Sequence, residues 1–415
     1  MNPTNGAAPF DPASHVAPGV SRRQLLVAGL VATLLLGATA CGGSGSSTAA
    51  TTAPANSSSA TASSAAVSTT ATSTAATAAD ATTADTVAAD TTAATTATST
   101  TTDATPAIVA AANAFLGSLT DDERDAVLFD FSDTEQRQQW SNLPEGLYER
   151  DGLMWGDLDE DSQQAWLAVL QAILSEQGYE QVYGEWHADD QLAGGGGMTY
   201  GSDYYWVAII GEPSETDAWQ FQFGGHHITI NATIKGTEVS LTPSFIGVQP
   251  SMYDSEGNEI RPLGSIEDDA YALVGSLDGD QTDAAVLGDT LIDLVLGPGE
   301  DGKTIENQGI AGSELTDEQR SLLLALIAHY GGLVNDEDAA SRMATLEAEL
   351  DDTYFAWYGP TDPSDSSGIY FRVTGPSIVI EYSGQQMGGD PTDHIHGIYR
   401  DPTNDYGAAF GAGLL

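Results

Sequence analysis

Cysteine and basic residues are scarce in this chain. Cys41 is the only cysteine among 415 residues, so no disulfide can form within the chain. Lysine and arginine together number 12 against 60 acidic residues, which gives a formal net charge of −48. A chain with this balance lacks the cationic side chains that recognise a nucleic-acid backbone or an anionic lipid surface. We therefore expect no nucleic-acid partner.

The acidic excess lies in residues 107–415, which carry 55 of the acidic residues and ten of the basic ones. The plainest interpretation is a halophilic protein: counterions at high salt screen the self-repulsion, and the carboxylates keep the surface hydrated. The alternative is an acidic surface that concentrates cations.

Residues 1–41 have the pattern of an export signal. The pair Arg22-Arg23 precedes an apolar run at residues 25–40, which is shorter than the roughly 20 residues of a membrane-spanning helix. Small residues end the run directly before Cys41. This order predicts a twin-arginine signal peptide of a lipoprotein, with a lipid on Cys41 that holds the protein on the cell-surface or periplasmic side of the membrane. A plain signal-peptidase site is the alternative.

Aromatic residues are absent from residues 42–106, which consist almost wholly of serine, threonine, alanine and glycine. Such a segment cannot bury enough apolar surface to offset the conformational entropy that folding removes. We therefore predict a disordered linker that acts as a stalk, followed by a globular domain at residues 107–415.

The apolar pattern of residues 107–415 changes between a helical period and a period of two. Helices and strands occur in runs without regular alternation, which favours an α+β fold with an antiparallel sheet and helices packed around it. Predicted helices are 108–116, 120–129, 133–140, 159–177, 266–277, 283–296, 316–330 and 336–350. Predicted strands are 204–210, 219–223, 226–234, 238–241, 354–357, 370–373, 377–382 and 394–399.

Four of the seven histidines lie in two short strand-like segments, as the pairs His226-His227 and His394-Ile395-His396. Alternate residues of a strand point to the same face, so the second pair offers two imidazoles on one side. In an unbroken strand His227 faces away from the apolar side, which makes it a better ligand than His226, unless a bulge at Gly224-Gly225 changes its direction. Imidazole suits zinc, copper or iron, so we expect a divalent transition metal on these four histidines.

Two carboxylates near the histidines are candidate catalytic groups. Glu381 alternates with apolar residues in a predicted strand, and Asp393 directly precedes His394. In a hydrolase, a metal-bound water would be the nucleophile and one of these carboxylates would accept its proton. A non-catalytic lipoprotein that binds a small molecule or a metal is the alternative function, and histidines with a purely structural role are a third interpretation.

Several motifs of residues 107–415 together carry a resemblance to a known family. They are Gly225-His226-His227-Ile228, Leu296-Gly297-Pro298-Gly299, Thr353-Tyr354-Phe355-Ala356-Trp357-Tyr358-Gly359, His394-Ile395-His396 and Arg400-Asp401-Pro402-Thr403-Asn404-Asp405-Tyr406-Gly407. Together they resemble the DUF3500 family of exported bacterial proteins. The resemblance supports the domain limits and the choice of histidines, but it implies no reaction and no catalytic residue.

Overall fold

The computed structural model describes residues 103–193, 198–387 and 389–414. The predicted signal peptide, its Cys41 and nearly all of the predicted linker lie outside these residues, so their predictions stay untested. The first helix begins at Thr105, two residues before the predicted start of the domain. Within the described ranges, no helix combines the length and the apolar character that crossing a membrane requires.

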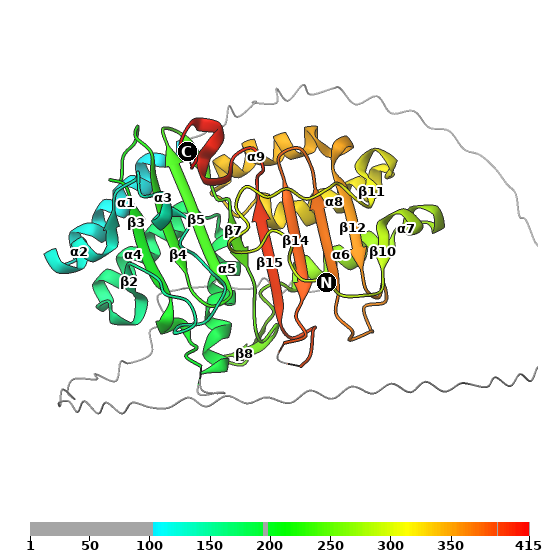
Figure 1. Cartoon of the computed structure of the whole chain (residues 1–415), viewed down its shortest axis with the longest axis horizontal. Helices are drawn as coiled ribbons and strands as arrows, with labels where there is room; N and C mark the ends of the chain where they lie inside the picture. The colour runs from blue at the N-terminus through cyan, green and yellow to red at the C-terminus, as the bar shows by residue number, and fades with distance from the viewer. Residues whose placement is uncertain (1–102, 194–197, 388, 415) are drawn as a thin grey trace, which may run out of the picture. The chain divides into compact units, whose positions relative to one another are not determined.

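A mostly antiparallel sheet forms the centre of the fold, and thirteen of its strands are found in the described residues. Its main path is β1-β3-β4-β5-β7-β15-β14-β13-β12-β10, and only the pairs β1–β3 and β10–β12 are parallel (Figure 1). The short strand β7 joins the two parts of the sheet because it pairs with both β5 and β15. The strands are β1 Leu128–Phe129, β2 Leu153–Met154, β3 Trp206–Ile210, β4 Trp219–Gly224, β5 Ile228–Lys235, β6 Glu238–Ser240, β7 Ser244–Ile246, β8 Tyr253–Ser255, β9 Asn258–Ile260, β10 Val286–Gly288, β11 Ile310–Ala311, β12 Tyr354–Tyr358, β13 Tyr370–Thr374, β14 Val379–Gly384 and β15 Ile395–Arg400.

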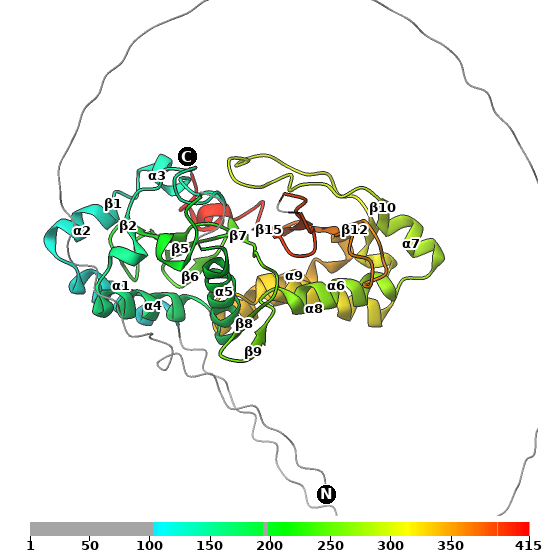
Figure 2. The same ribbon diagram turned by 90° about the horizontal axis from the view of Figure 1, so that it is seen from below.

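Helices cover one face of this sheet: α1 and α4 lie side by side over one part, and α6, α8 and α9 lie over the other (Figure 2). The opposite face is covered by α3 and by the segment between β10 and β11. The predicted α+β class is therefore confirmed. The helices are α1 Thr105–Ser118, α2 Asp121–Val127, α3 Thr134–Arg137, α4 Glu160–Ile173, α5 Glu176–Ala188, α6 Gly264–Gly275, α7 Gly279–Ala285, α8 Asp317–Gly331 and α9 Asp336–Ala348.

Aromatic side chains join the helices to the sheet. Trp166 of α4 stacks on Phe221 of β4 with ring centroids 4.2 Å apart, and both side chains are fully buried. In the other part of the sheet, Tyr271 of α6 meets Trp357 of β12 edge to face at 5.2 Å. Rings of this size bury about 150–250 Å² each, so such contacts contribute much of the stability of the core.

Most predicted elements are confirmed, and two helix predictions are wrong. The predicted helix at 159–177 ends at Ile173, and a second helix, α5, begins at Glu176 after a separate N-cap at Ser175. The predicted helix at 283–296 ends at Ala285, because Val286–Gly288 pairs with β12 as an edge strand. Residues 289–296 then form an irregular segment that crosses the sheet.

The fold contains two similar halves, residues 105–235 and 264–384. The order α1-α2-β1-β2-α4-α5-β3-β4-β5 in the first half corresponds to α6-α7-β10-β11-α8-α9-β12-β13-β14 in the second, with α3 added in the first half alone. The strand pairings repeat as well: β1 with β3 and β10 with β12 are parallel, whereas β2 with β3 and β11 with β12 are antiparallel. Leu174 and Val334, which follow α4 and α8, pair with each other and join the halves.

Candidate metal centre

The first histidine pair lies at the tip of the β4–β5 hairpin. Gly224 pairs with Thr229, and the Gly225 N–H donates to the carbonyl of Ile228 over 2.9 Å, which leaves His226 and His227 as the two residues of a tight turn. The predicted strand at 226–234 therefore begins two residues later, at Ile228, and Gly224-Gly225 leads into a turn and does not form the bulge that was considered as an alternative. Because the two histidines do not alternate along a strand, the argument that preferred His227 on grounds of parity does not apply.

The turn places His227 in an unusual backbone conformation. Its φ of 72° lies in the left-handed region, which residues with a side chain adopt rarely and at a cost in free energy. Gly225 is required beside it, since a Cβ atom there would lie 2.7 Å from the Tyr205 ring. The Tyr205 hydroxyl donates to the carbonyl of His226, and Nη2 of Arg150 donates to the carbonyl of Gly225 over 3.1 Å. These contacts hold the strained turn in place.

The second histidine pair lies where β15 begins. His394 precedes the strand and His396 is inside it, and their rings meet edge to face with centroids 4.7 Å apart. Val248, which follows β7, pairs with Ile395 and fixes this end of β15 beside the hairpin tip. Imidazoles separated by 167 positions in the sequence are thereby brought together.

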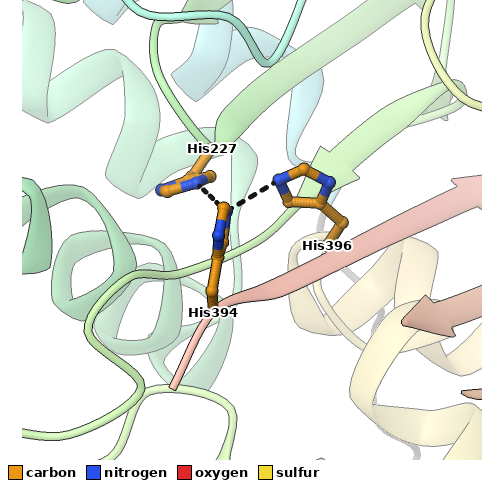
Figure 3. Close-up of side chains that lie close together, drawn as sticks. All are labelled: His227, His394 and His396. Carbon is orange, nitrogen blue, oxygen red and sulfur yellow. Dashed lines mark hydrogen bonds between the residues drawn. The ribbon is translucent and has the colours of Figure 1, made fainter. Parts of the chain in front are cut away.

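Three imidazole nitrogens converge on one point. The Nε2 atom of His394 lies 2.9 Å from Nε2 of His227 and 3.0 Å from Nε2 of His396 (Figure 3). The three side chains are buried, with at most 8% of each exposed to solvent. Nitrogens at this spacing form one of two groups within metal-binding distance among the described residues.

Hydrogen bonds fix the tautomer of the central ring. Nδ1 of His394 lies 2.6 Å from the carbonyl oxygen of Met387, which can only accept, so Nδ1 carries the proton. Nε2 of the neutral His394 ring then presents a lone pair to both neighbouring imidazoles. A carbonyl that orients a histidine through its second nitrogen is a common feature around metal-ligating rings.

The second group joins the hairpin tip to the end of α5. Nδ1 of His226 donates to Oδ1 of Asp189 over 2.6 Å, and Nδ1 of His227 lies 4.0 Å from the same oxygen. His227 therefore belongs to both groups, one at each ring nitrogen. Asp189 was missed in the sequence analysis, because nothing in its spacing distinguishes it from the many other carboxylates of the domain.

Burial keeps these imidazoles in the neutral form that metals bind. Removal from water, reinforced by the neighbouring His226, holds the pKa of His227 well below its usual value. Burial lowers the pKa of His396 to about 3, with a further contribution from His394. The pKa of His394 is also lowered by burial, although its hydrogen bond to the Met387 carbonyl opposes the shift.

The two predicted catalytic carboxylates lie outside both metal-binding groups. Glu381 is fully buried on β14, where it accepts hydrogen bonds from the Val295 and Leu296 N–H groups at 2.8 Å and from the Tyr370 hydroxyl at 2.6 Å. It thereby fastens the segment after β10 across the sheet. Asp393 accepts a hydrogen bond from the N–H of Ser251 at 3.1 Å. The contacts of both residues are those of groups that position loops.

Fold and geometry together define an α+β domain with a buried histidine cluster whose ring nitrogens lie close enough together to hold a metal ion. A family model described as "Protein of unknown function (DUF3500)" matches residues 101–408, and the chain belongs to the DUF3500 family. The resemblance drawn from the motifs is thereby confirmed. Neither the curated proteins nor the solved structures include a match to this chain.

Proposed function

We propose that this protein is an exported, lipid-anchored metalloprotein that binds a divalent transition metal through His227, His394 and His396. The observation that carries the proposal is the position of the His394 Nε2 lone pair, 2.9 Å and 3.0 Å from the Nε2 atoms of the other two rings. One lone pair cannot accept two good hydrogen bonds from rings on different sides. A cation at the centre of the three nitrogens satisfies all of them at once.

The nitrogen spacing fits a small tetrahedral ion. Two imidazole nitrogens bound to zinc at about 2.05 Å and at the tetrahedral angle lie about 3.3 Å apart. The His394 nitrogen, at 2.9 Å and 3.0 Å from its two neighbours, therefore needs to move from each by only a few tenths of an ångström. Asp189 supports the site through His226 and His227, as carboxylates outside the coordination sphere commonly do.

Three protein ligands leave a tetrahedral ion with one free position, which is the arrangement of catalytic rather than structural zinc sites. The free position supports a metal-dependent enzyme acting on a small-molecule substrate, with a metal-bound water as the nucleophile if the reaction is hydrolytic. The alternative is a lipoprotein that binds a metal or a small molecule without catalysis, and it would fill the same position with its ligand.

Metal analysis of protein purified without a histidine tag tests the proposal. We expect about one transition-metal ion per chain, measured by plasma mass spectrometry, and its loss in the His394→Ala variant. His329→Ala is the matched control, because His329 is a comparably buried histidine on α8 that pairs with Asp269 outside both groups. Metal-free protein, or a His394→Ala variant that keeps its metal, would contradict the proposal.

The sequence pattern around Cys41 supports the proposed lipid anchor, which a separate experiment tests. We expect labelled fatty acid to be incorporated into the intact protein and not into a Cys41→Ser variant, which would appear in the soluble fraction. Equal labelling of the two proteins would exclude a lipid on this residue.

A further inference from the structure

Arg150 is a buried cation that has no counter-charge beside it. Only 7% of the residue is exposed to solvent. Among the described residues, no carboxylate lies within ion-pairing distance of its guanidinium. The ring of Tyr148 compensates the charge in part, with its centroid 5.3 Å from Cζ. Because the removal of an ion from water costs free energy, a buried charge normally has a partner of opposite sign.

One terminal nitrogen of this guanidinium binds the protein backbone, and the other is left over. Nη2 donates to the carbonyls of Ser141, Leu143 and Gly225 at 2.9 Å, 2.6 Å and 3.1 Å. In the part of the chain that the structure describes, Nη1 of Arg150 and Oγ1 of Thr229 are both buried without a hydrogen-bond partner. Thr229 is itself only 1% exposed. Two buried polar groups in this condition indicate a ligand, because each is unfavourable if its hydrogen bonds stay unmade.

Arg150 and Thr229 line the same small cavity. Its volume is about 10 Å³, which is room for a single particle of the size of a water molecule. Trp140 and Trp206 form part of its wall. Gly224 also lines it and pairs with Thr229 as the last backbone pair before the tight turn of the first histidine pair. A particle that fills so small a space contacts the residues around it, including the two with unpaired groups.

The charge of the guanidinium decides between a water molecule and an ion. Water would satisfy the two polar groups but would leave the buried charge unpaired, whereas an anion accepts both hydrogen bonds and neutralises the charge. The volume excludes phosphate, sulfate and carboxylates, which leaves a monatomic anion such as chloride. Asp151 also lines the cavity, but it is exposed, so solvent screens its repulsion of an anion.

We propose that this cavity is a halide site, in which a chloride ion accepts hydrogen bonds from Nη1 of Arg150 and from the hydroxyl of Thr229. The ion neutralises the guanidinium, whose Nη2 holds the Gly225 carbonyl directly before the histidine turn. The inference does not depend on the metal proposed for the histidines, since none of the residues that line the cavity is a proposed metal ligand.

The chloride dependence of stability tests the site in solution. The full chain is unfolded with urea at constant ionic strength while chloride is replaced stepwise by gluconate, which is too large for the cavity. We expect a saturable stabilisation by chloride, and at least tenfold weaker chloride binding in Thr229→Val, which removes the hydroxyl and keeps the shape. Without chloride, this variant should be at least as stable as the parent protein, because it lacks the unpaired hydroxyl.

Thr233→Val is the matched control. Thr233 lies on the same strand, is as fully buried and has a hydroxyl that is likewise without a partner among the described residues, but it does not line the cavity. Its variant should respond to chloride as the parent protein does.

Bromide soaked into crystals of the parent protein gives a direct measurement, because bromide scatters anomalously and water does not. We expect an anomalous peak in the cavity beside Nη1 of Arg150. Water alone in the cavity, equal stabilisation of Thr229→Val and the parent protein by chloride, or a bromide peak without any chloride effect in solution would each overturn the proposal. The metal content of the histidine cluster is measured separately, so failure of the halide site leaves the metalloprotein proposal intact.

Discussion

Asp189 and Glu349 occupy the same place in the two halves of the fold, at the C-terminal ends of α5 and α9. Each carboxylate reaches the tip of the hairpin in its own half. Asp189 binds Nδ1 of His226 at the first tip, and Glu349 accepts a hydrogen bond from the hydroxyl of Ser377 at the second. The two tips also close alike, since Gly225 bonds to Ile228 and Gly375 to Ile378.

The two turn residues differ completely between the tips. The first tip has two histidines, whereas the second has Pro376 and Ser377. Arg342 fills the space beside the second tip, where it donates to the carbonyl of Ser377 at 2.5 Å and pairs with Asp401 at 2.9 Å. The same backbone therefore presents imidazoles in one half and a neutralised charge cluster in the other. The comparison shows that the fold alone does not create the candidate site, which requires the histidines of the first tip together with those at the start of β15.

The strongest way to break this comparison is to remove the imidazole from the first tip alone. We expect His227→Asn to lose the bound metal entirely, because Nε2 of His227 is one of the three converging nitrogens. Asparagine tolerates the left-handed backbone better than most residues, so the turn should persist. The measurement is metal content by mass spectrometry, with circular dichroism as the check of folding.

Ser377→Ala at the second tip is the matched control and should keep its full metal content. Loss of metal in this variant, or retention of metal in folded His227→Asn protein, would mean that the two tips do not differ in function as described. His394→Ala should lose as much metal as His227→Asn, since the ligands lie in one cluster.

The histidine cluster could be predicted in part from the sequence, because histidine is rare in this chain and two pairs stand close to strands. The direction of each ring could not be predicted, because it depends on whether Gly224-Gly225 continues a strand or ends it. Only the pairing of Gly224 with Thr229 decides that question. Asp189 could not be found at all, since its role follows from the position of a helix end in space.

The eight predicted strands are all found, because apolar alternation marks buried strands directly. Short strands such as β7 and β10 are too brief to show this alternation, and the repeat of the two halves is not visible in the sequence. Equivalent positions of the two halves have similar backbone geometry, but few of them share the same amino acid. Gly152 and Gly309, for example, both have positive φ, and a Cβ atom would overlap a carbonyl of the neighbouring strand at each position. Two glycines in a chain with 45 of them give no signal until the pairing of the strands is known.

The contact between the two halves gives the next prediction, and it depends on a glycine of α5. Gly178 of α5 lies against Leu333, and a Cβ atom there would overlap the Leu333 carbonyl oxygen. We expect Gly178→Ala to destabilise the protein by about 1–3 kcal/mol through overpacking. Chemical denaturation followed by tryptophan fluorescence measures the change.

Gly117→Ala provides the matched control, because Gly117 is an exposed helical glycine with nothing within 4 Å of an added Cβ. It should leave stability unchanged or raise it by about 0.5–1 kcal/mol. If the two alanine variants had equal stability, the contact of Gly178 with Leu333 would not hold the halves together.

Asp338 is the residue of the second half that corresponds to Gly178. The Gly178 N–H donates to the N-cap side chain of α5, and the Asp338 N–H donates to the N-cap side chain of α9. Partial burial raises the pKa of Asp338 to about 6 from an ordinary value of 3.8, against a hydrogen bond from Asn335 that lowers it. The folded state therefore favours the protonated carboxyl, and the stability of the protein falls as pH rises from about 4 through 6.

We expect Asp338→Asn, which stays neutral, to be more stable than the parent protein at pH 7.5 by about 1 kcal/mol, after the pKa shift is discounted for solvent screening at this half-exposed site. The difference should vanish below pH 4. Thermal unfolding across this pH range measures it, and a constant difference at all pH values would contradict the assignment to Asp338.

The smallest expected effect tests whether the helix starts of the two halves are equivalent. Thr120 is the N-cap of α2 and Asp278 is the N-cap of α7, and each forms a capping box with the residue three positions on, Glu123 or Gln281. Each capping box satisfies two N–H groups at the start of its own helix. Thr120→Ala and Asp278→Ala should therefore each destabilise the protein by about 0.5–1 kcal/mol. Distant caps should act independently, so the double variant should lose the sum, as measured by denaturant titration. A double variant no less stable than either single one would show that one of the two helix starts is already frayed, and that the halves differ in stability as well as at their tips.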